Sequence, residues 1–261
     1  MRLGLLVAFV LAASSAAFGA SVPDFSGLTY EQRLGNQIPL QQRFRDETGR
    51  DFTLAELVAP SKPLILALVY FHCPNLCGVV RSDLFDALKR SGMTAGRDYS
   101  LVALSIDPSE SSTDAKAAKR DDMQRFPTPG AADHWHFLIG SADAIKAVAD
   151  SVGFHERYDP EIKQFVHPVG IVFATPTGIV SSYLLGVGYQ PGDVGLGVTR
   201  AQSGGVTAAA LPVLLLCFHY DPTTGRYTLE IMKLLRLAAA ITVAVVAGTL
   251  FLAFRRDGGR T

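Results

Sequence analysis

The sequence predicts an α/β domain with a mainly parallel central sheet, flanking helices and a closing β-hairpin. Three short aliphatic runs alternate with three segments of helical period, and strands separated by helices favour parallel pairing. A last apolar stretch, residues 169–186, is interrupted by Pro176, Thr177 and Gly178, which is typical of a hairpin turn.

Each element has its own signal. Residues 63–71 ("PLILALVYF") are a short apolar run bounded by prolines, which indicates a buried strand. Residues 77–92 place apolar side chains at a helical period and end at Gly92. The remaining predicted elements are a strand over 99–107, a polar and mostly exposed helix over 111–126, a strand over 134–140 and a helix over 141–154 with Ser141 as its cap. Upstream, "QQRFRDETGRDFTL" indicates a short strand pair that turns at "DETGR".

Composition argues against a nucleic-acid partner and against an acidic solvating arm. Among 261 residues, Lys+Arg and Asp+Glu both number 24, so no net basic charge points to nucleic acid and no acidic excess points to a solvating arm. Hydrophobic residues make up 48% of the chain, and we attribute this high share to the two chain ends.

The N-terminus, "MRLGLLVAFVLAASSAAFGA", has the layout of a secretory signal peptide over residues 1–20. One cationic residue, Arg2, precedes an apolar stretch and then small residues. An uncleaved anchor helix is the alternative. No cysteine stands near the cleavage region, which argues against a lipoprotein.

The C-terminus predicts a transmembrane helix over residues 233–256. Residues 237–254 carry no charge, the minimum length for a span, and arginines follow them. Because positive residues favour the cytoplasmic side, the tail 257–261 is expected inside, with the domain 21–232 outside, on the periplasmic side of a bacterial inner membrane. The alternative is a buried C-terminal helix.

Cys73 and Cys77, in "YFHCPNLCG", follow the first strand and begin its helix. Parallel strands place functional sites at their carboxyl ends, and a helix N-terminus favours thiolate over thiol. The order strand, CxxxC, helix is thioredoxin-like. Such thiolates can exchange disulfides or bind a soft metal such as Cu(I), and an inert buried pair is the third possibility.

A three-ligand copper site with two sulfurs also needs an imidazole. His167, in "KQFVHPVGIVF", lies in a loop just before a predicted strand, next to Pro168. In a thioredoxin-like topology this loop meets the CxxxC loop, so His167 is the candidate. Taken singly, the other histidines are more typical of surface or core positions: His72, His134, His136, His155 and His219.

Four segments together resemble the Sco/SenC proteins, over residues 25–230: "YFHCPNLCG", "LVALSIDPSESSTDAKAAK", "HWHFLIGSADAIKAVADSVGF" and "FVHPVGIVFATPTGIVSSYLLGV". The resemblance implies a thioredoxin-like, membrane-tethered, copper-binding protein that serves in assembling the CuA centre of cytochrome c oxidase. It implies Cys73, Cys77 and His167 as ligands of Cu(I), and of Cu(II) as a second state. The implied partners are the CuA subunit and a further copper chaperone or thiol reductase.

The chain departs from the family pattern at three positions. Asn75 and Gly78 replace an aspartate and a proline around the cysteines, and Val166 replaces an aspartate before the histidine. These changes remove negative charge near the metal and leave the ligand set intact. A C-terminal span also differs from the commoner N-terminal anchor.

Two further residues each have two interpretations. Asp107, in "SIDPSE", ends the second strand, where it could orient a ligand or simply start a turn. Cys217, in "LLLCFHYDP", could be a small buried hydrophobe or could act with His219 on a metal or a mixed disulfide.

Three functions remain open. The first is a copper-binding assembly factor rather than a conventional enzyme, and the second is a membrane-anchored thiol–disulfide oxidoreductase. The third, a peroxidase of the same fold, is disfavoured because no threonine lies between Tyr70 and Cys77.

Overall fold

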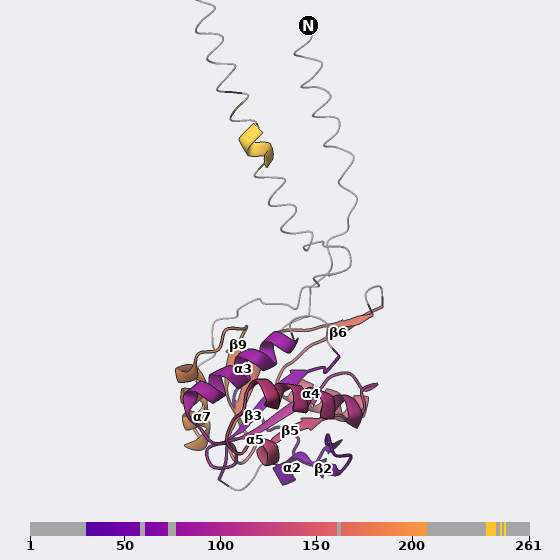
Figure 1. Ribbon diagram of the computed structural model, residues 1–261, viewed down its shortest axis with the longest axis vertical. Helices are drawn as coiled ribbons and strands as arrows, with labels where there is room; N and C mark the ends of the chain where they lie inside the picture. Colours follow the sequence, from indigo (N-terminus) through magenta and orange to yellow (C-terminus); the bar gives the residue numbers. More distant parts are fainter. Residues whose placement is uncertain are drawn as a thin grey trace, which may run out of the picture. The chain divides into compact units, whose positions relative to one another are not determined.

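A computed structural model describes residues 30–57, 61–72, 77–160, 163–207, 239–243, 246 and 248. The chain divides into two units, of which the first is Gly27–His219. The first unit holds all the named elements (Figure 1). Its strands are β1 (Arg43–Arg45), β2 (Asp51–Thr53), β3 (Leu64–Val69), β4 (Ser100–Ser105), β5 (Trp135–Leu138), β6 (Arg157–Asp159), β7 (Gln164–Val166), β8 (Gly170–Ala174) and β9 (Val180–Leu185). Its helices are α2 (Leu54–Leu57), α3 (Cys77–Ser91), α4 (Ser112–Arg125), α5 (Ala131–His134), α6 (Ala142–Ser151) and α7 (Pro191–Gln202).

The central sheet has the order β5-β4-β3-β8-β9. β3, β4 and β5 pair in parallel, whereas β8 pairs antiparallel with both β3 and β9. The predicted closing hairpin is therefore confirmed, but the prediction of a mainly parallel sheet is corrected: the sheet is mixed. The reason is that the chain forms the β6–β7 hairpin after α6 and then enters the sheet from the opposite direction.

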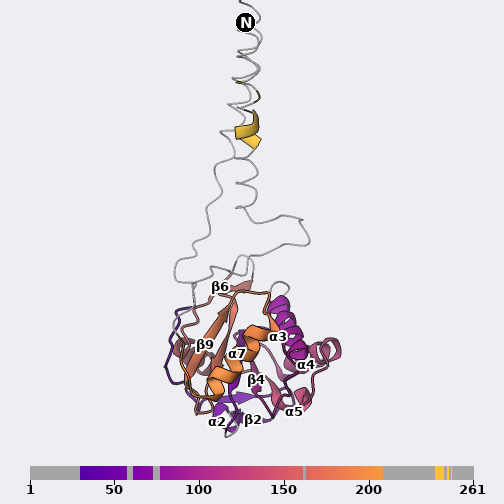
Figure 2. The same cartoon turned by 90° about the vertical axis from the view of Figure 1, so that its left-hand side faces the viewer.

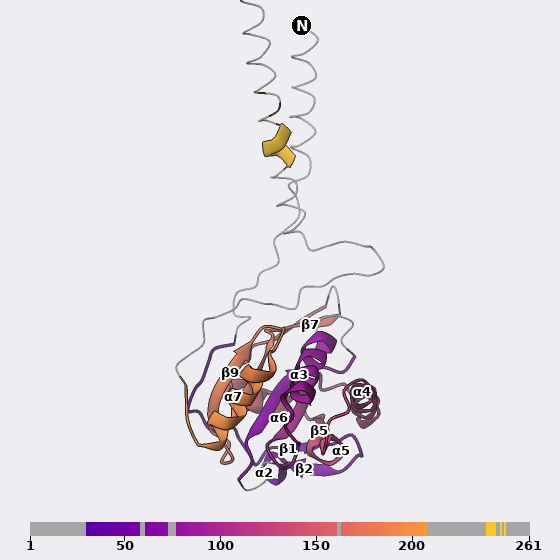
Figure 3. The same cartoon turned by 60° about the vertical axis from the view of Figure 1, so that its left-hand side comes forward.

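The core lies around this sheet. Every residue of β3, β4 and β8 is buried, as expected for strands covered on both faces. α3 and α7 contact each other, and α7 also packs on β8 and β9 (Figures 1 and 2). α4 lies beside α3 (Figure 3).

The helix ends and the turn predicted from local sequence signals agree with the structure. Gly92, which follows α3, has a φ of 72°, a left-handed conformation that favours glycine and ends the helix. Ser141 caps α6, because its hydroxyl accepts a hydrogen bond from the N–H of Ala144 at 3.3 Å. The predicted strand pair around "DETGR" is β1 and β2.

Two further expectations need correction. His134 ends the one-turn helix α5, so the strand predicted over 134–140 begins one residue later. The helix predicted as polar and mostly exposed, α4, buries Lys119 and Asp122, because both meet opposite charges inside the protein. In addition, α2, α7 and the β6–β7 hairpin were not predicted.

The predictions for the chain ends lie outside the described residues: the signal peptide 1–20, and nearly all of the span 233–256 and the tail 257–261. Cys217 and His219 lie outside them as well. Within the part of the chain that is described, no helix has the length and apolar character needed to cross a membrane.

Candidate metal centre

The candidate site lies where β3 ends. β3 runs toward the cysteine segment, and Cys77 is the first residue of α3. β8 pairs antiparallel with β3, so the start of β8 lies beside the end of β3. His167 stands three residues before β8, at this same edge. Cys73 and the side chain of Cys77 lie outside the described part of the structure.

His167 is buried, with 1% of its surface exposed. Its ring centroid lies 6.0 Å from that of Tyr70 at an interplanar angle of 73°, and 5.7 Å from that of Phe154. Tyr70 stands three residues before Cys73. The structure therefore brings His167 against the segment that leads into the cysteine pair.

The hydrogen bonding of His167 suits a metal ligand. Its Nδ1 lies 2.9 Å from the carbonyl oxygen of Pro168. A carbonyl oxygen only accepts, so Nδ1 carries the hydrogen and Nε2 carries the lone pair in the neutral ring. Ligating histidines commonly fix their tautomer with such a bond. One imidazole and two thiolates are a donor set that fits Cu(I).

The start of α3 is electrostatically suited to thiolates. Its first turn contains no acidic residue, so the positive end of the helix dipole is not neutralised there. One turn later, Arg81 is 7% exposed at its side chain and pairs with Asp122 of α4 at 2.7 Å. The Arg81 guanidinium also lies 5.9 Å from the ring centroid of Phe71. Arg81 thus joins α3 to α4 and also lies over the Phe71 ring.

A partly buried carboxyl, that of Glu156, interacts electrostatically with His167. Burial raises the pKa of Glu156, which directly precedes β6, and the interactions with Lys146 and His167 oppose that rise. Glu156 is separated from His167 in sequence by the β6–β7 hairpin.

Of the other described histidines, His72 directly precedes Cys73 and its ring lies near Glu110 and Asp114, whereas the remaining three lie elsewhere. His134 packs its ring over the backbone of Gly96, and His155 lies 3.5 Å from Glu31 at the surface. His136 faces Phe52 with ring centroids 6.4 Å apart, and burial lowers its pKa to about 4. Within the described residues, no three side chains of His, Cys, Asp or Glu form a group that could hold a metal.

Asp107 takes the turn role in the structure. Its Oδ1 accepts hydrogen bonds from the N–H of Ser109 at 2.8 Å and from its hydroxyl at 2.6 Å. This is the local pattern of an aspartate that starts a turn.

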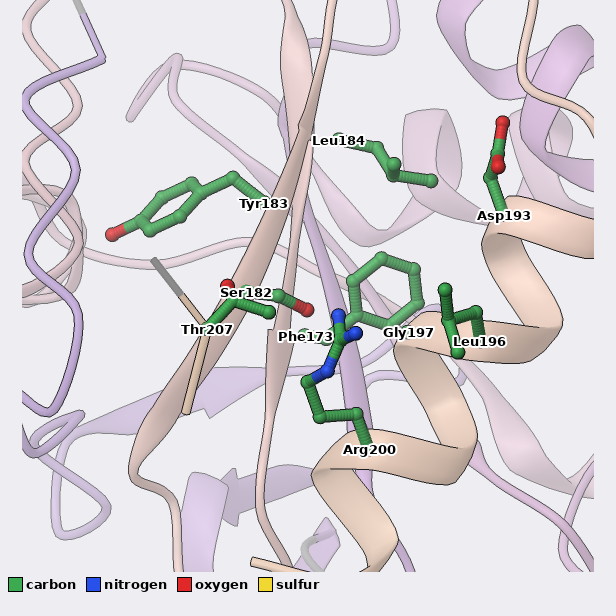
Figure 4. Close-up of a pocket in the computed structure, with 9 residues that line it drawn as sticks. All are labelled: Phe173, Ser182, Tyr183, Leu184, Asp193, Leu196, Gly197, Arg200 and Thr207. Carbon is green, nitrogen blue, oxygen red and sulfur yellow. The ribbon is translucent and has the colours of Figure 1, made fainter. Parts of the chain in front are cut away.

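A small pocket lies away from these residues (Figure 4). It has a volume of about 180 Å³ and lies between β9 and α7, with Phe173 in its wall and Arg200 directed into it. The hydroxyl of Ser182 in its wall is buried and has no hydrogen-bond partner among the described residues. Among the described residues, His167 does not line this pocket, so the pocket is separate from that histidine.

Solved structures share this architecture. A protein from Aquifex aeolicus VF5 matches with a TM-score of 0.58 and 22% identity, over 66% of this chain and 95% of that chain. A SCO1/SenC family lipoprotein from Bacillus anthracis str. Ames matches with a TM-score of 0.53 and 20% identity, over 66% and 98%. The chain has the fold of the Sco/SenC proteins. BsSco, a member of the Sco family of cytochrome c oxidase assembly proteins, has a TM-score of 0.51 and 19% identity, over 66% and 96%.

No protein-family model matches the sequence, and no match is found among curated proteins. The likeness to Sco proteins is therefore one of fold. It confirms the predicted thioredoxin-like α/β architecture, with a mixed sheet in place of the mainly parallel one.

Within this Sco fold, Glu110 is the residue that sequence reasoning missed. It follows β4, and its buried carboxylate accepts hydrogen bonds from the N–H groups of Phe71 and His72. The signal that could have found it was its position: β4 neighbours β3, and the carboxyl ends of parallel strands meet at one edge. In this segment the sequence pattern drew attention to Asp107 alone.

Proposed function

We propose that this protein is a membrane-tethered, Sco-type assembly factor that carries Cu(I) to the CuA centre of cytochrome c oxidase. The observation that carries the proposal is the burial of His167 against Tyr70, at the edge of a Sco fold where the cysteine segment leaves β3. The names of two proteins with this fold support it, a SCO1/SenC family lipoprotein and a Sco family oxidase assembly protein.

In this proposal Cys73, Cys77 and His167 hold the copper ion, which is cargo. The two thiolates supply soft ligands, and the N-terminus of α3 favours their ionised form. His167 supplies a neutral imidazole whose tautomer is fixed by the carbonyl oxygen of Pro168. Delivery then proceeds by ligand exchange, as thiolates of the receiving subunit replace those of this protein.

The proposal includes a location. The domain 21–232 lies on the periplasmic side of a bacterial inner membrane, after removal of a signal peptide, and is anchored by a helix within residues 233–256. A reporter that is active only in the cytoplasm should be active when fused after Thr261 and silent when fused near Leu216; activity at Leu216 would contradict this orientation.

A second function is a thiol–disulfide oxidoreductase that reduces the cysteines of the oxidase subunit or of another exported protein. BsSco, which shares this fold, contains a disulfide switch. Two cysteines that bracket a helix N-terminus are also suited to exchange. Exchange uses sulfur alone, so this function does not require His167.

The substitution His167→Ala separates the two functions. Losing one of three ligands should weaken Cu(I) binding by more than tenfold, or at least about 1.4 kcal/mol. Even the loss of a residue that only hydrogen-bonds to a ligand commonly lowers metal affinity about tenfold. The Cys73–Cys77 pair should still form and exchange a disulfide. The measurements are an anaerobic Cu(I) titration of the full chain and the amount of CuA oxidase assembled in cells.

His155→Ala is the matched control, because His155 is a partly exposed histidine that lies beside Glu31. It should leave copper binding and oxidase assembly unchanged. If His167→Ala supports normal oxidase assembly while Cys73→Ala does not, the protein acts as a thiol reductase and the copper function is wrong.

A further inference from the structure

A buried carboxylate holds the backbone that leads into Cys73. The Glu110 side chain is 2% exposed. Its Oε1 accepts the N–H of His72 at 2.6 Å, and its Oε2 accepts the N–H of Phe71 at 2.9 Å. Oε2 also accepts the hydroxyl of Ser105 at 2.6 Å. Both oxygens are thus used, and two of the three donors are consecutive backbone amides.

The N–H groups of Phe71 and His72 lie just past the end of the β3–β4 pairing, so they need an acceptor outside the sheet. The N–H of Ile106 donates to the carbonyl of Val69 at 2.7 Å, the last backbone hydrogen bond between this end of β3 and the β4 segment. Beyond it, Glu110 is the acceptor for Phe71 and His72. Both hydrogen bonds are partly buried, so loss of the acceptor would cost free energy, and the carboxylate thereby fixes the path of this segment.

The charge on Glu110 has no strong cation to offset it. Among the described residues, only the His72 ring lies within ion-pair distance, with its Nδ1 3.2 Å from Oε1. The Nε2 of the same ring lies 3.4 Å from Asp114. Burying a carboxylate costs free energy, and here that cost is offset chiefly by hydrogen bonds to the loop.

We propose that Glu110 is a positioning residue for the metal centre: it fixes the backbone at Phe71 and His72 and thereby the direction from which the chain enters Cys73. A glutamine in its place keeps the shape but has one acceptor oxygen and an NH₂ donor. One loop amide would then lose its acceptor and face a donor, so the segment would loosen.

The copper readout distinguishes positioning from charge. A nearby negative charge opposes ionisation of the thiols but attracts the Cu(I) cation, so the charge effect is measured by Asp114→Asn, which removes a carboxylate charge beside the same His72 ring. Loss of positioning would make binding weaker, by about tenfold, as for residues that orient ligands. This readout rests on the proposed function, so a second readout without copper is needed.

The experiment compares Glu110→Gln, Asp114→Asn and the unchanged full chain, without metal and with the cysteines reduced. Asp114 is the matched control, because it also faces the His72 ring but bonds neither loop amide. Amide hydrogen exchange at Phe71 and His72 should be slow in the unchanged protein and in Asp114→Asn. In Glu110→Gln it should accelerate at least tenfold, while exchange within β3 and β4 stays unchanged.

Cu(I) affinity, measured by competition with a chromophoric chelator, should fall about tenfold in Glu110→Gln and stay within twofold in Asp114→Asn. Unchanged exchange at Phe71 and His72, or Cu(I) binding as tight as in the unchanged protein, would overturn the positioning role. If Glu110→Gln does not fold, fast exchange of these two amides in the unchanged protein would overturn it instead. Absence of Cu(I) binding by the unchanged protein would overturn the proposed function, while the exchange measurement would still decide the role of Glu110.

Discussion

Two regions of this protein bury a carboxylate, and they do so in different ways. Between α3 and α4, Asp122 is fully buried and bonds Arg81 at 2.7 Å and Arg125 at 2.9 Å. At the entrance to the cysteine segment, Glu110 is also buried, but it bonds two backbone amides and a hydroxyl. One carboxylate joins two helices, and the other holds a loop.

The difference shows how a buried charge can serve stability or geometry. Burial raises the pKa of Asp122, and the two arginines oppose this rise. An ion pair across two helices holds them together but leaves the path of a loop unspecified. A carboxylate that accepts consecutive amides specifies that path. Substitutions in the two regions should therefore separate stability from copper affinity.

The largest expected effect is in the ion-pair region. Asp122→Ala leaves Arg81 buried without its partner, which should lower the free energy of unfolding by about 3–5 kcal/mol. Cu(I) affinity of the folded protein should stay within twofold. Urea unfolding and chelator competition provide the two measurements.

Asp121→Ala is the control for this substitution. Asp121 is 53% exposed and pairs with Arg120 at the surface, so its loss should cost less than about 1 kcal/mol. If Cu(I) affinity fell as steeply as stability in Asp122→Ala, the proposed separation between the two regions would be wrong.

A second prediction concerns the pH dependence of stability and His136, which lies near Lys119 of α4 and Glu47. Burial lowers the pKa of His136 from 6.5 to about 4, and the nearby Lys119 charge adds to the shift while Glu47 opposes it. Above pH 6.5 the ring is neutral in both the folded and unfolded states. As the pH falls toward 4, the unfolded state takes up a proton that the folded state resists. His136 should therefore reduce stability by up to about 3 kcal/mol across this window.

The variant His136→Gln removes this titration. Its free energy of unfolding should fall less than that of the unchanged protein between pH 7.5 and pH 4.5, as measured by urea unfolding at both values. His155→Gln, at a partly exposed position, should behave like the unchanged protein. Equal acid losses in all three proteins would show that His136 is readily protonated in the folded state.

The central strands and α6 could be predicted because their signals are local. Residues 63–71 are apolar throughout, and Ser141 caps α6 as expected. α7 could not be predicted, because "PGDVGLGVTRAQ" contains three glycines and has low helix propensity. Packing explains the helix: Val194, Val198 and Ala201 are buried. A Cβ on Gly197 would come 2.7 Å from the ring of Phe173, so glycine permits this close approach.

The site was partly predictable for the same reason. The expectation that the His167 loop approaches the cysteine segment followed from strand order, and the contact with Tyr70 agrees with it. The sequence pattern pointed to Asp107 and not to Glu110, because only the folded chain shows that the Glu110 carboxylate reaches the segment that follows β3. The ligand set itself stays a prediction.

The smallest expected effect concerns Asp107. Its two hydrogen bonds to Ser109 are local and partly exposed, so Asp107→Ala should lower the free energy of unfolding by about 1 kcal/mol. If Asp107 only starts a turn, Cu(I) affinity should stay within twofold, in contrast to the tenfold loss expected for Glu110→Gln. Ser109→Ala, which removes only the hydroxyl partner, should cost less than Asp107→Ala in urea unfolding. A tenfold loss of Cu(I) affinity in Asp107→Ala would instead show that Asp107 orients a ligand, and the positioning of the cysteine segment would then be shared between the two acidic residues that follow β4.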